Sequence, residues 1–143
     1  MERKASEKIA NIGKVYRTQK NAVWIEAEMK DFEKAFGALK AAGAEHISAI
    51  TGTDRTKYLE VIYHFWHGGK ELNLKFRLPA KNSRVRTITG HYPGAELFER
   101  ELAEMLGIDV EGHPSPGRLL LDKGSPKAPL RRKAGGTKAG GSK

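Results

Sequence analysis

The sequence predicts an α+β domain with two layers, in which one mixed sheet of about five strands carries helices mainly on one face and an extended C-terminal tail follows. Apolar and polar residues alternate along several stretches, which indicates strands. Elsewhere apolar residues recur three and four apart, which indicates helices. The helices fall between groups of strands rather than after every strand, and this order favours α+β over a regular α/β fold.

The first half of the chain predicts two helices and a strand pair. An amphipathic helix is expected over roughly the first ten residues, ending at Gly13. Strands are expected at 14–19 and 22–29, joined by a polar turn. Asp31 is a suitable N-cap for a helix that runs to Ala42, where Gly43 provides the stop.

Three further strands are expected at 46–51, 57–66 and 71–78. The pair Gly68-Gly69 predicts a tight turn, so the last two of these strands should be antiparallel. The strand at 71–78 has the clearest alternation of the whole chain, and Pro79 should end its hydrogen-bond ladder.

A polar loop is expected at 80–94, in which the hydrophobic residues Ile88 and Tyr92 should attach the loop to the domain. A helix should follow at 95–106 and stop at Gly107. Its predicted inward stripe is Leu97, Phe98, Glu101, Leu102, Met105 and Leu106. A short apolar run at 119–121 then precedes the tail.

The formal net charge of +9 resides mostly in the tail. Residues 123–143 hold seven basic residues and no acidic one, so residues 1–122 are only +2. The sequence therefore divides into a domain with its exit segment, 1–122, and a basic Gly/Lys-rich tail, 123–143. Three interpretations of the tail remain open: a solvated tail, an arm that docks on an acidic neighbour or anionic lipid, or a nucleic-acid contact.

The sequence predicts no cysteine cross-links or cysteine-held metals, no signal peptide and no membrane-spanning helix. The chain contains no cysteine, which excludes disulfides and cysteine-ligated zinc or iron–sulfur clusters within it. The charged N-terminus lacks the apolar region of a signal peptide. The longest apolar-rich run, 59–66, is far shorter than the roughly 20 residues of a spanning helix.

No catalytic or metal-binding arrangement is predicted. His64 and His67 are three apart near a strand and should point to opposite faces, and the other histidines are scattered. The carboxylates of Glu99, Glu101 and Glu104 are expected on the surface, with Glu99 turned away from the other two.

The helix at 95–106 instead suggests a docking surface. Glu101 falls on the predicted apolar stripe, where a charge needs a partner. Arg100 has a planar guanidinium group, which can form two parallel hydrogen bonds with a carboxylate across an interface. Gly112 and Pro114 predict a sharp bend where the chain leaves the domain.

These residues carry a family resemblance. The segments that carry it are 85–89 (VRTIT), 92–95 (YPGA), 98–101 (FERE), 107–108 (GI) and 112–114 (GHP). Together they resemble the signature of the thirty-kilodalton, or C, subunit of respiratory complex I. That family includes the equivalent subunits of membrane-bound nickel–iron hydrogenases and related archaeal ion-pumping complexes. The resemblance is strongest over 88–121.

The resemblance implies a non-catalytic subunit of the peripheral arm of a membrane complex, on the cytoplasmic face of the cell membrane. It implies no cofactor in this chain, with iron–sulfur clusters, and a nickel–iron site or quinone, on partner subunits. The implied partners are the large, hydrogenase-like subunit and the small iron–sulfur subunit, and no nucleic acid. The residues that match the motif, and so are candidates for the partner interface, are Glu99, Arg100, Glu101, Glu104, Gly107, Gly112, His113, Pro114 and Arg118.

The chain also departs from the family pattern. After His113-Pro114 it reads SPGR, so only Arg118 remains of a usual basic pair, and Gly90 and Leu106 replace a usual acidic and a usual aromatic residue. Which complex the chain belongs to is therefore left open. The alternative function is a basic RNA-binding module, supported by the tail and the aromatic strand at 58–66.

Overall fold

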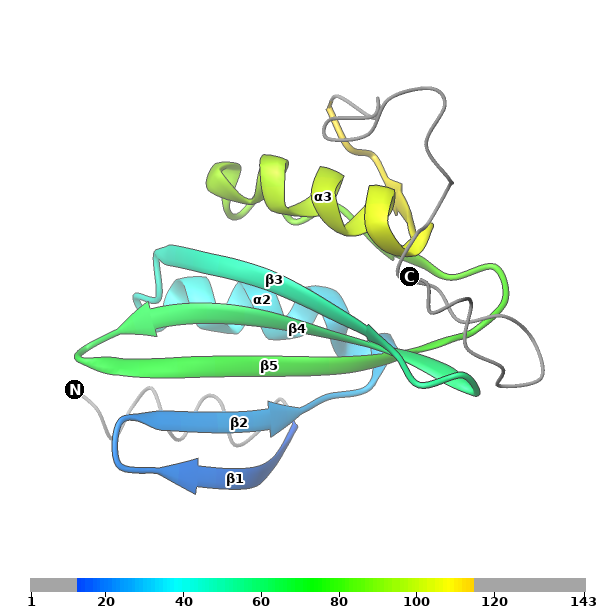
Figure 1. Cartoon of the computed structure of the whole chain (residues 1–143). Coiled ribbons are helices and arrows are strands. Elements are labelled where there is room, and N and C mark those ends of the chain that lie inside the picture. Colours follow the sequence, from blue (N-terminus) through cyan, green and yellow to red (C-terminus); the bar gives the residue numbers. More distant parts are fainter. Residues whose placement is uncertain (1–12, 115–143) are drawn as a thin grey trace.

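The computed structural model describes residues 13–114 and contains a mixed, five-stranded sheet with the order β1-β2-β5-β4-β3 (Figure 1). The β2–β5 pair is parallel and the other three pairs are antiparallel. This confirms the predicted fold class. The strands are β1 Lys14–Gln19, β2 Ala22–Glu26, β3 His46–Asp54, β4 Tyr58–His67 and β5 Lys70–Pro79.

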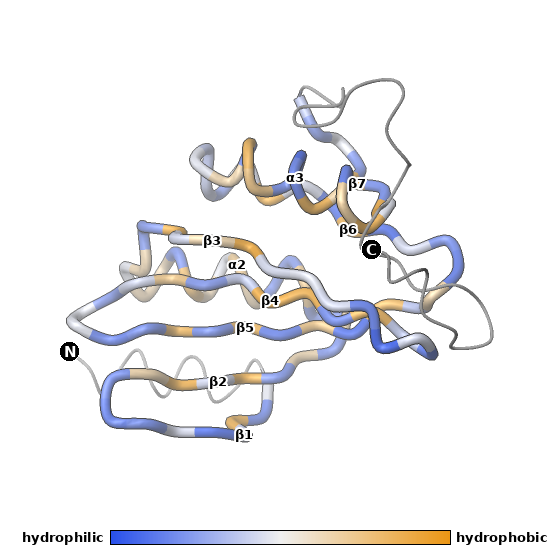
Figure 2. The backbone as a smooth tube through the Cα atoms, in the orientation of Figure 1, coloured by the Kyte–Doolittle hydropathy of each residue, from blue (hydrophilic) through white to orange (hydrophobic). Residues whose placement is uncertain are grey.

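The two central strands form because their alternation matches the pleat of a sheet. Leu59, Val61, Tyr63 and Phe65 of β4 are fully buried, and the apolar residues of β5 lie beside them. Gly68 and Gly69 both have positive φ, 61° and 77°, as the predicted tight turn requires. Figure 2 shows that β1, at the sheet edge, is mostly hydrophilic, and all six of its residues are exposed.

Helix α2 (Phe32–Ala41) covers one face of the sheet. Phe32 and Phe36 pack against Tyr63 and Phe76, with ring centroids 4.8 to 6.0 Å apart. The edge-to-face and tilted geometries are those that aromatic rings prefer. The aromatic part of the hydrophobic core therefore lies between α2 and the strands β4 and β5, and the same apolar cluster continues to Leu102 and Leu106.

The ends of the elements differ from the predictions in several places. Strand β2 ends at Glu26, because the chain turns into the 3-10 helix η1 (Met29–Asp31). Strand β3 continues to Asp54, since it pairs along its length with β4. Asp31 is the N-cap of α2, as predicted, but its side chain makes no capping hydrogen bond. Gly43 ends the helix region with φ 95°.

The C-terminal part holds more structure than the predicted loop and helix. Strands β6 (Arg84–Arg86) and β7 (Asp109–Glu111) pair in parallel as a second, two-stranded sheet. The expectation of an irregular 80–94 loop was wrong here, because strands of three residues are too short to show a period. The predicted helix appears as η2 (Pro93–Ala95) followed by α3 (Glu96–Leu106).

Helix α3 packs against β3 rather than over the middle of the sheet (Figure 1). Gly52 of β3 makes this approach possible. A Cβ there would lie 2.3 Å from Cδ1 of Leu106 and 2.7 Å from Cδ1 of Leu102. The missing side chain lets the two leucines sit directly on the strand.

The predicted helix in 1–10, the apolar run at 119–121 and the tail at 123–143 lie outside the described residues. Within residues 13–114, neither α2 nor α3 has the length and hydrophobicity of a membrane-spanning helix.

Candidate functional site

Helix α3 carries four of the nine candidate interface residues, and its two ends are fixed by the sequence around them. Pro93 begins η2, which leads directly into the helix. Gly107 ends it in the left-handed conformation, φ 70°, and its N–H donates to the carbonyl of Ala103. Leu102 and Leu106 are buried towards β3, 4% and 1% exposed, so this side of α3 faces the domain.

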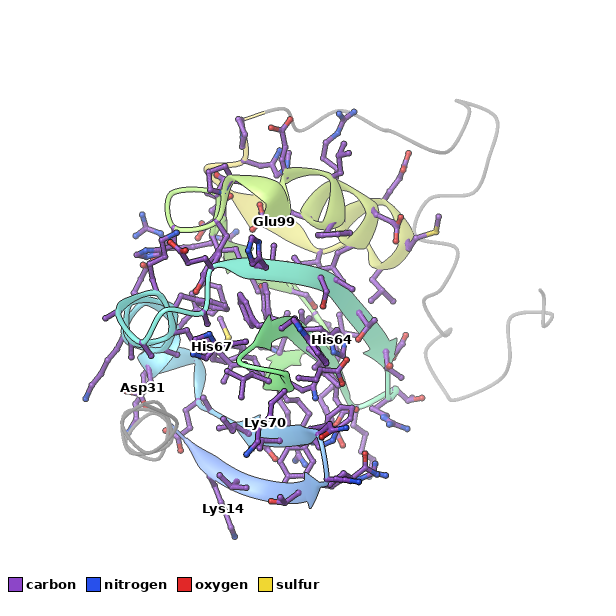
Figure 3. All side chains as sticks on the ribbon, turned by 90° about the vertical axis from the view of Figure 1, so that its left-hand side faces the viewer. Lys14, Asp31, His64, His67, Lys70 and Glu99 are labelled. Carbon is purple, nitrogen blue, oxygen red and sulfur yellow. The ribbon has the colours of Figure 1, made fainter. Side chains whose placement is uncertain are left out.

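Glu99 is the central residue of the site, and it is completely buried. Its Oε1 accepts a hydrogen bond from the Thr87 hydroxyl at 2.6 Å, and its Oε2 accepts one from the Ile88 backbone N–H at 2.7 Å. The prediction that Glu99 is a surface carboxylate was therefore wrong. The inward stripe passes through Ala95, Glu99, Leu102 and Leu106, and Figure 3 shows Glu99 on α3.

The Thr87 hydroxyl is fully used in this contact. Its oxygen accepts the backbone N–H of Thr89 at 3.1 Å and lies 2.8 Å from the Thr89 hydroxyl. Its single hydrogen is therefore directed at Glu99. The sequence pointed to 85–89 only as part of a resemblance, and nothing in its pattern singled out Thr87 as a partner of Glu99.

His113 approaches Glu99 from the other side. Its side chain is only 2% exposed, and its Nε2 lies 2.9 Å from the Glu96 carbonyl and 3.9 Å from Glu99 Oε1. Because a carbonyl can only accept, Nε2 carries a hydrogen and donates it. His113 therefore joins the chain after β7 to the first turn of α3.

The environment of Glu99 shifts its titration. Burial raises the pKa of its carboxyl group above the ordinary value for glutamate. The bonds from Thr87 and Ile88, and the nearby His113, oppose this shift without cancelling it. The folded protein consequently favours the protonated form of Glu99 more than an exposed glutamate would.

The opposite side of α3 is the one turned to solvent. Leu97 is 56% exposed and Glu101 is exposed, so both predictions that placed them on the inward stripe were wrong. The stripe is rotated because Glu99 satisfies its carboxylate inside the domain. Arg100 is half-buried, and Glu104 is 8% exposed rather than on the surface as expected.

The remaining motif residues shape the exit of the chain. Gly112 has φ 79°, and a Cβ there would lie 3.3 Å from the Thr87 methyl group. This supports the predicted bend. Pro114 is exposed at the end of the described chain, and Arg118 lies outside it.

The side of the sheet that carries Glu26, Glu60 and Lys75 is a second polar region. Lys75 lies 3.3 Å from Glu60 and 3.6 Å from Glu26, and Arg55 lies 2.9 Å from Glu60. Burial alone would raise the pKa of Glu60, but these two cations outweigh it and hold the pKa low. Arg77 also pairs with Glu26, at 3.0 Å.

Three cations of this region also lie over aromatic rings: Arg17 over Trp24, Lys75 over Tyr16, and Arg77 over Tyr58. The cations of this region are thus engaged with the protein's own carboxylates and aromatic rings. Among residues 13–114, no three potential ligands come together as a metal site.

The fold and this site define a class of protein: a small α+β domain whose C-terminal helix is anchored by a buried carboxylate and presents its other side outward. Residues 25–139 match the family described as the respiratory-chain NADH dehydrogenase 30 Kd subunit. The match covers more than half of the chain, and the chain belongs to this family.

Curated relatives agree with the family. The chain is 36% identical over 94 residues to the C subunit of the NADH-quinone oxidoreductase of Rhizobium rhizogenes, covering 63% of this chain and 47% of that protein. It is 32% identical over 107 residues to the corresponding protein of a Ruegeria species, covering 74% and 53%. The chain therefore spans about half the length of the curated relatives it matches.

Two solved structures have the same fold. A chain of the membrane-bound sulfane sulfur reductase, an archaeal respiratory membrane complex, gives a TM-score of 0.76 at 18% identity, covering 91% of this chain and 82% of that chain. A trypsin-resistant fragment of Nqo5 gives 0.68 at 24% identity, covering 80% and 97%.

Proposed function

We propose that this chain is a non-catalytic subunit of the peripheral arm of a membrane-bound, ion-pumping electron-transfer complex. The proposal rests on the difference between the two sides of α3, in a chain that belongs to this family. One side of the helix is bound to the domain through Glu99, Leu102 and Leu106, and the other exposes Leu97 and Glu101. An exposed leucine on a helix fixed in this way is suited to contact a partner.

The proposed partners are the large, hydrogenase-like subunit and the small iron–sulfur subunit of the same complex. Leu97, Arg100 and Glu101 lie three and four residues apart and so share one side of α3. Leu97 would fill an apolar site on the partner, and the two charged side chains at its border would set the orientation. Pro114 would direct the chain along that partner.

The redox centres of the complex belong to the partners in this proposal. A chain without cysteine cannot hold a cysteine-ligated iron–sulfur cluster. The iron–sulfur clusters, and the nickel–iron site or quinone, are therefore assigned to the large and small subunits. The chain itself would lie at the cytoplasmic face of the cell membrane as a peripheral component.

Charge reversal on α3 tests this assignment. The tagged full-length chain is purified from detergent-solubilised membranes, and the eluate is analysed for iron–sulfur and antiporter-like subunits. Arg100→Glu should remove these subunits while leaving the chain folded, because the reversed charge would repel the carboxylate that Arg100 is proposed to meet. Lys34→Glu makes the same reversal at an exposed position of α2 and should copurify like the wild type.

Normal assembly of the Arg100→Glu variant would refute the docking role of this helix. An eluate from the wild-type chain that lacks cluster-bearing subunits would refute the proposed function itself.

A further inference from the structure

We propose that Thr87, Glu99 and His113 form an internal clasp, which fixes the direction in which the chain leaves the domain after Pro114. The clasp deepens the proposed function and rests on it, because the exit segment is the part that would reach the partner. It assigns to Glu99 and His113 a positioning role inside this subunit, in place of the direct partner contact that the resemblance suggested.

The clasp joins three segments that are distant in sequence. Thr87 follows β6, Glu99 lies in the first turn of α3, and His113 follows β7. Both oxygens of Glu99 are used, by the Thr87 hydroxyl and the Ile88 N–H. His113 is held by the Glu96 carbonyl at 2.9 Å and stays within 3.9 Å of Glu99.

The backbone reinforces the same geometry. The Thr87 N–H donates to the Glu111 carbonyl at 2.8 Å, which continues the β6–β7 pairing up to the bend. Gly112 then turns with a positive φ close to the Thr87 methyl group. The residues immediately before Pro114 are therefore held from both sides, and the direction of exit follows from these contacts.

Two of the three clasp residues, Glu99 and His113, cannot meet a partner directly. Glu99 is fully buried and the His113 side chain is 2% exposed. Any effect of these residues on assembly has to pass through the position of the exit segment and of α3. The large core around α2 does not depend on them, since Phe32, Phe36, Tyr63 and Phe76 pack against one another.

Hydrogen exchange on the full chain tests the clasp without a partner. Glu99→Ala leaves the buried Ile88 N–H without its acceptor and should raise amide exchange at 84–89 and 108–113 about tenfold or more. Exchange in β4 and β5 should not change. Glu101→Ala removes an exposed carboxylate two residues along the same helix and should leave exchange as in the wild type.

Variants of His113 separate positioning from simple loss of structure. His113→Ala should raise exchange at 108–113 and reduce copurification with the cluster-bearing subunits severalfold. His113→Gln keeps an N–H donor for the Glu96 carbonyl and should recover part of both. Recovery by glutamine is not expected if the imidazole itself contacts the partner.

The outcomes are distinguishable. Exchange that rises equally in β4 and β5 after Glu99→Ala would show a general structural role and overturn the clasp. Local loosening with normal copurification would overturn its role in docking. Failure of the wild-type chain to copurify would overturn the proposed function and the docking role, whereas the exchange pattern would still decide whether the clasp exists.

Discussion

The five-stranded sheet with α2 and the C-terminal part from Arg84 to Pro114 are held together in different ways. One continuous apolar cluster runs through both parts, and in the sheet it is built around the aromatic rings of α2, β4 and β5. The C-terminal part contributes Ile88, Leu102 and Leu106 to that cluster. It differs in having a buried carboxylate at its centre, with polar partners from two other segments. The comparison shows that one small domain combines a tolerant apolar scaffold with a polar centre that specifies one geometry.

The largest loss of stability is expected for a substitution in the core between α2 and the sheet. Phe36 is fully buried and its ring contacts those of Phe32, Tyr63, Phe65 and Phe76. Phe36→Ala should lower the free energy of unfolding by about 3–5 kcal/mol. Urea denaturation measures this loss, and a loss below about 1 kcal/mol would contradict the position of the core.

An intermediate effect is expected where the two regions meet. Gly52→Val would drive new methyl groups into Leu102 and Leu106 and push α3 away from β3. The expected loss is about 1–3 kcal/mol, from overpacking. Gly37→Val is the matched control for the added volume, because a Cβ at Gly37 meets nothing within 4 Å. Valine is a better helix former than glycine, so Gly37→Val should not lower the stability of α2. An equal loss in both variants would therefore argue against the close contact.

A smaller effect concerns the pH dependence of stability. Burial raises the pKa of Glu99 in the folded state, so between the two pKa values the folded chain holds a proton that the unfolded chain has lost. The stability from this group is fully present below the unfolded pKa of about 4.3. It is lost as the pH rises through the folded pKa.

Glu99→Gln should remove this component. Its amide can accept from Ile88 and donate to Thr87, whose hydroxyl would then turn to Thr89. The difference in unfolding free energy between variant and wild type should therefore move in favour of glutamine as the pH rises from about 4 towards neutrality. Parallel curves for the two proteins would contradict the raised pKa.

The sequence predicted the sheet well because the sheet follows a local period. The alternation of Leu72, Leu74, Phe76 and Leu78 and the pair Gly68-Gly69 predicted β5, its buried face and the antiparallel turn, and the structure confirms them. Gly107 and Gly43 likewise marked the ends of two helices. Each of these signals lies within a few residues of the element that it predicts.

The site could be predicted only in part. The motif residues pointed to α3 and the exit, but helical periodicity alone placed Glu101 inward and Glu99 outward. The reverse holds because the acceptors of Glu99 find donors on Thr87 and Ile88, twelve and eleven residues away in the chain. The periodicity of a single helix or strand cannot show a contact with another segment of the chain. Strands β6 and β7 were missed for the same reason, since each is defined by the other.

The substitution with the smallest expected effect on stability, at Leu97, has the largest expected effect on assembly. Leu97 and Leu102 lie five residues apart on α3, one 56% and the other 4% exposed. Leu97→Asp should change the free energy of unfolding by no more than about 0.5 kcal/mol, whereas Leu102→Ala should cost about 2–5 kcal/mol. Denaturation of both variants checks the two sides of the helix.

The most direct test of the outward-facing role of α3 is copurification of the Leu97→Asp chain from solubilised membranes, beside the wild type and the Lys34→Glu control. We expect the variant to remain folded and to lose the cluster-bearing subunits, because a carboxylate would replace the apolar anchor. Retention of those subunits at the wild-type level would contradict the claim that this side of α3 docks on the complex.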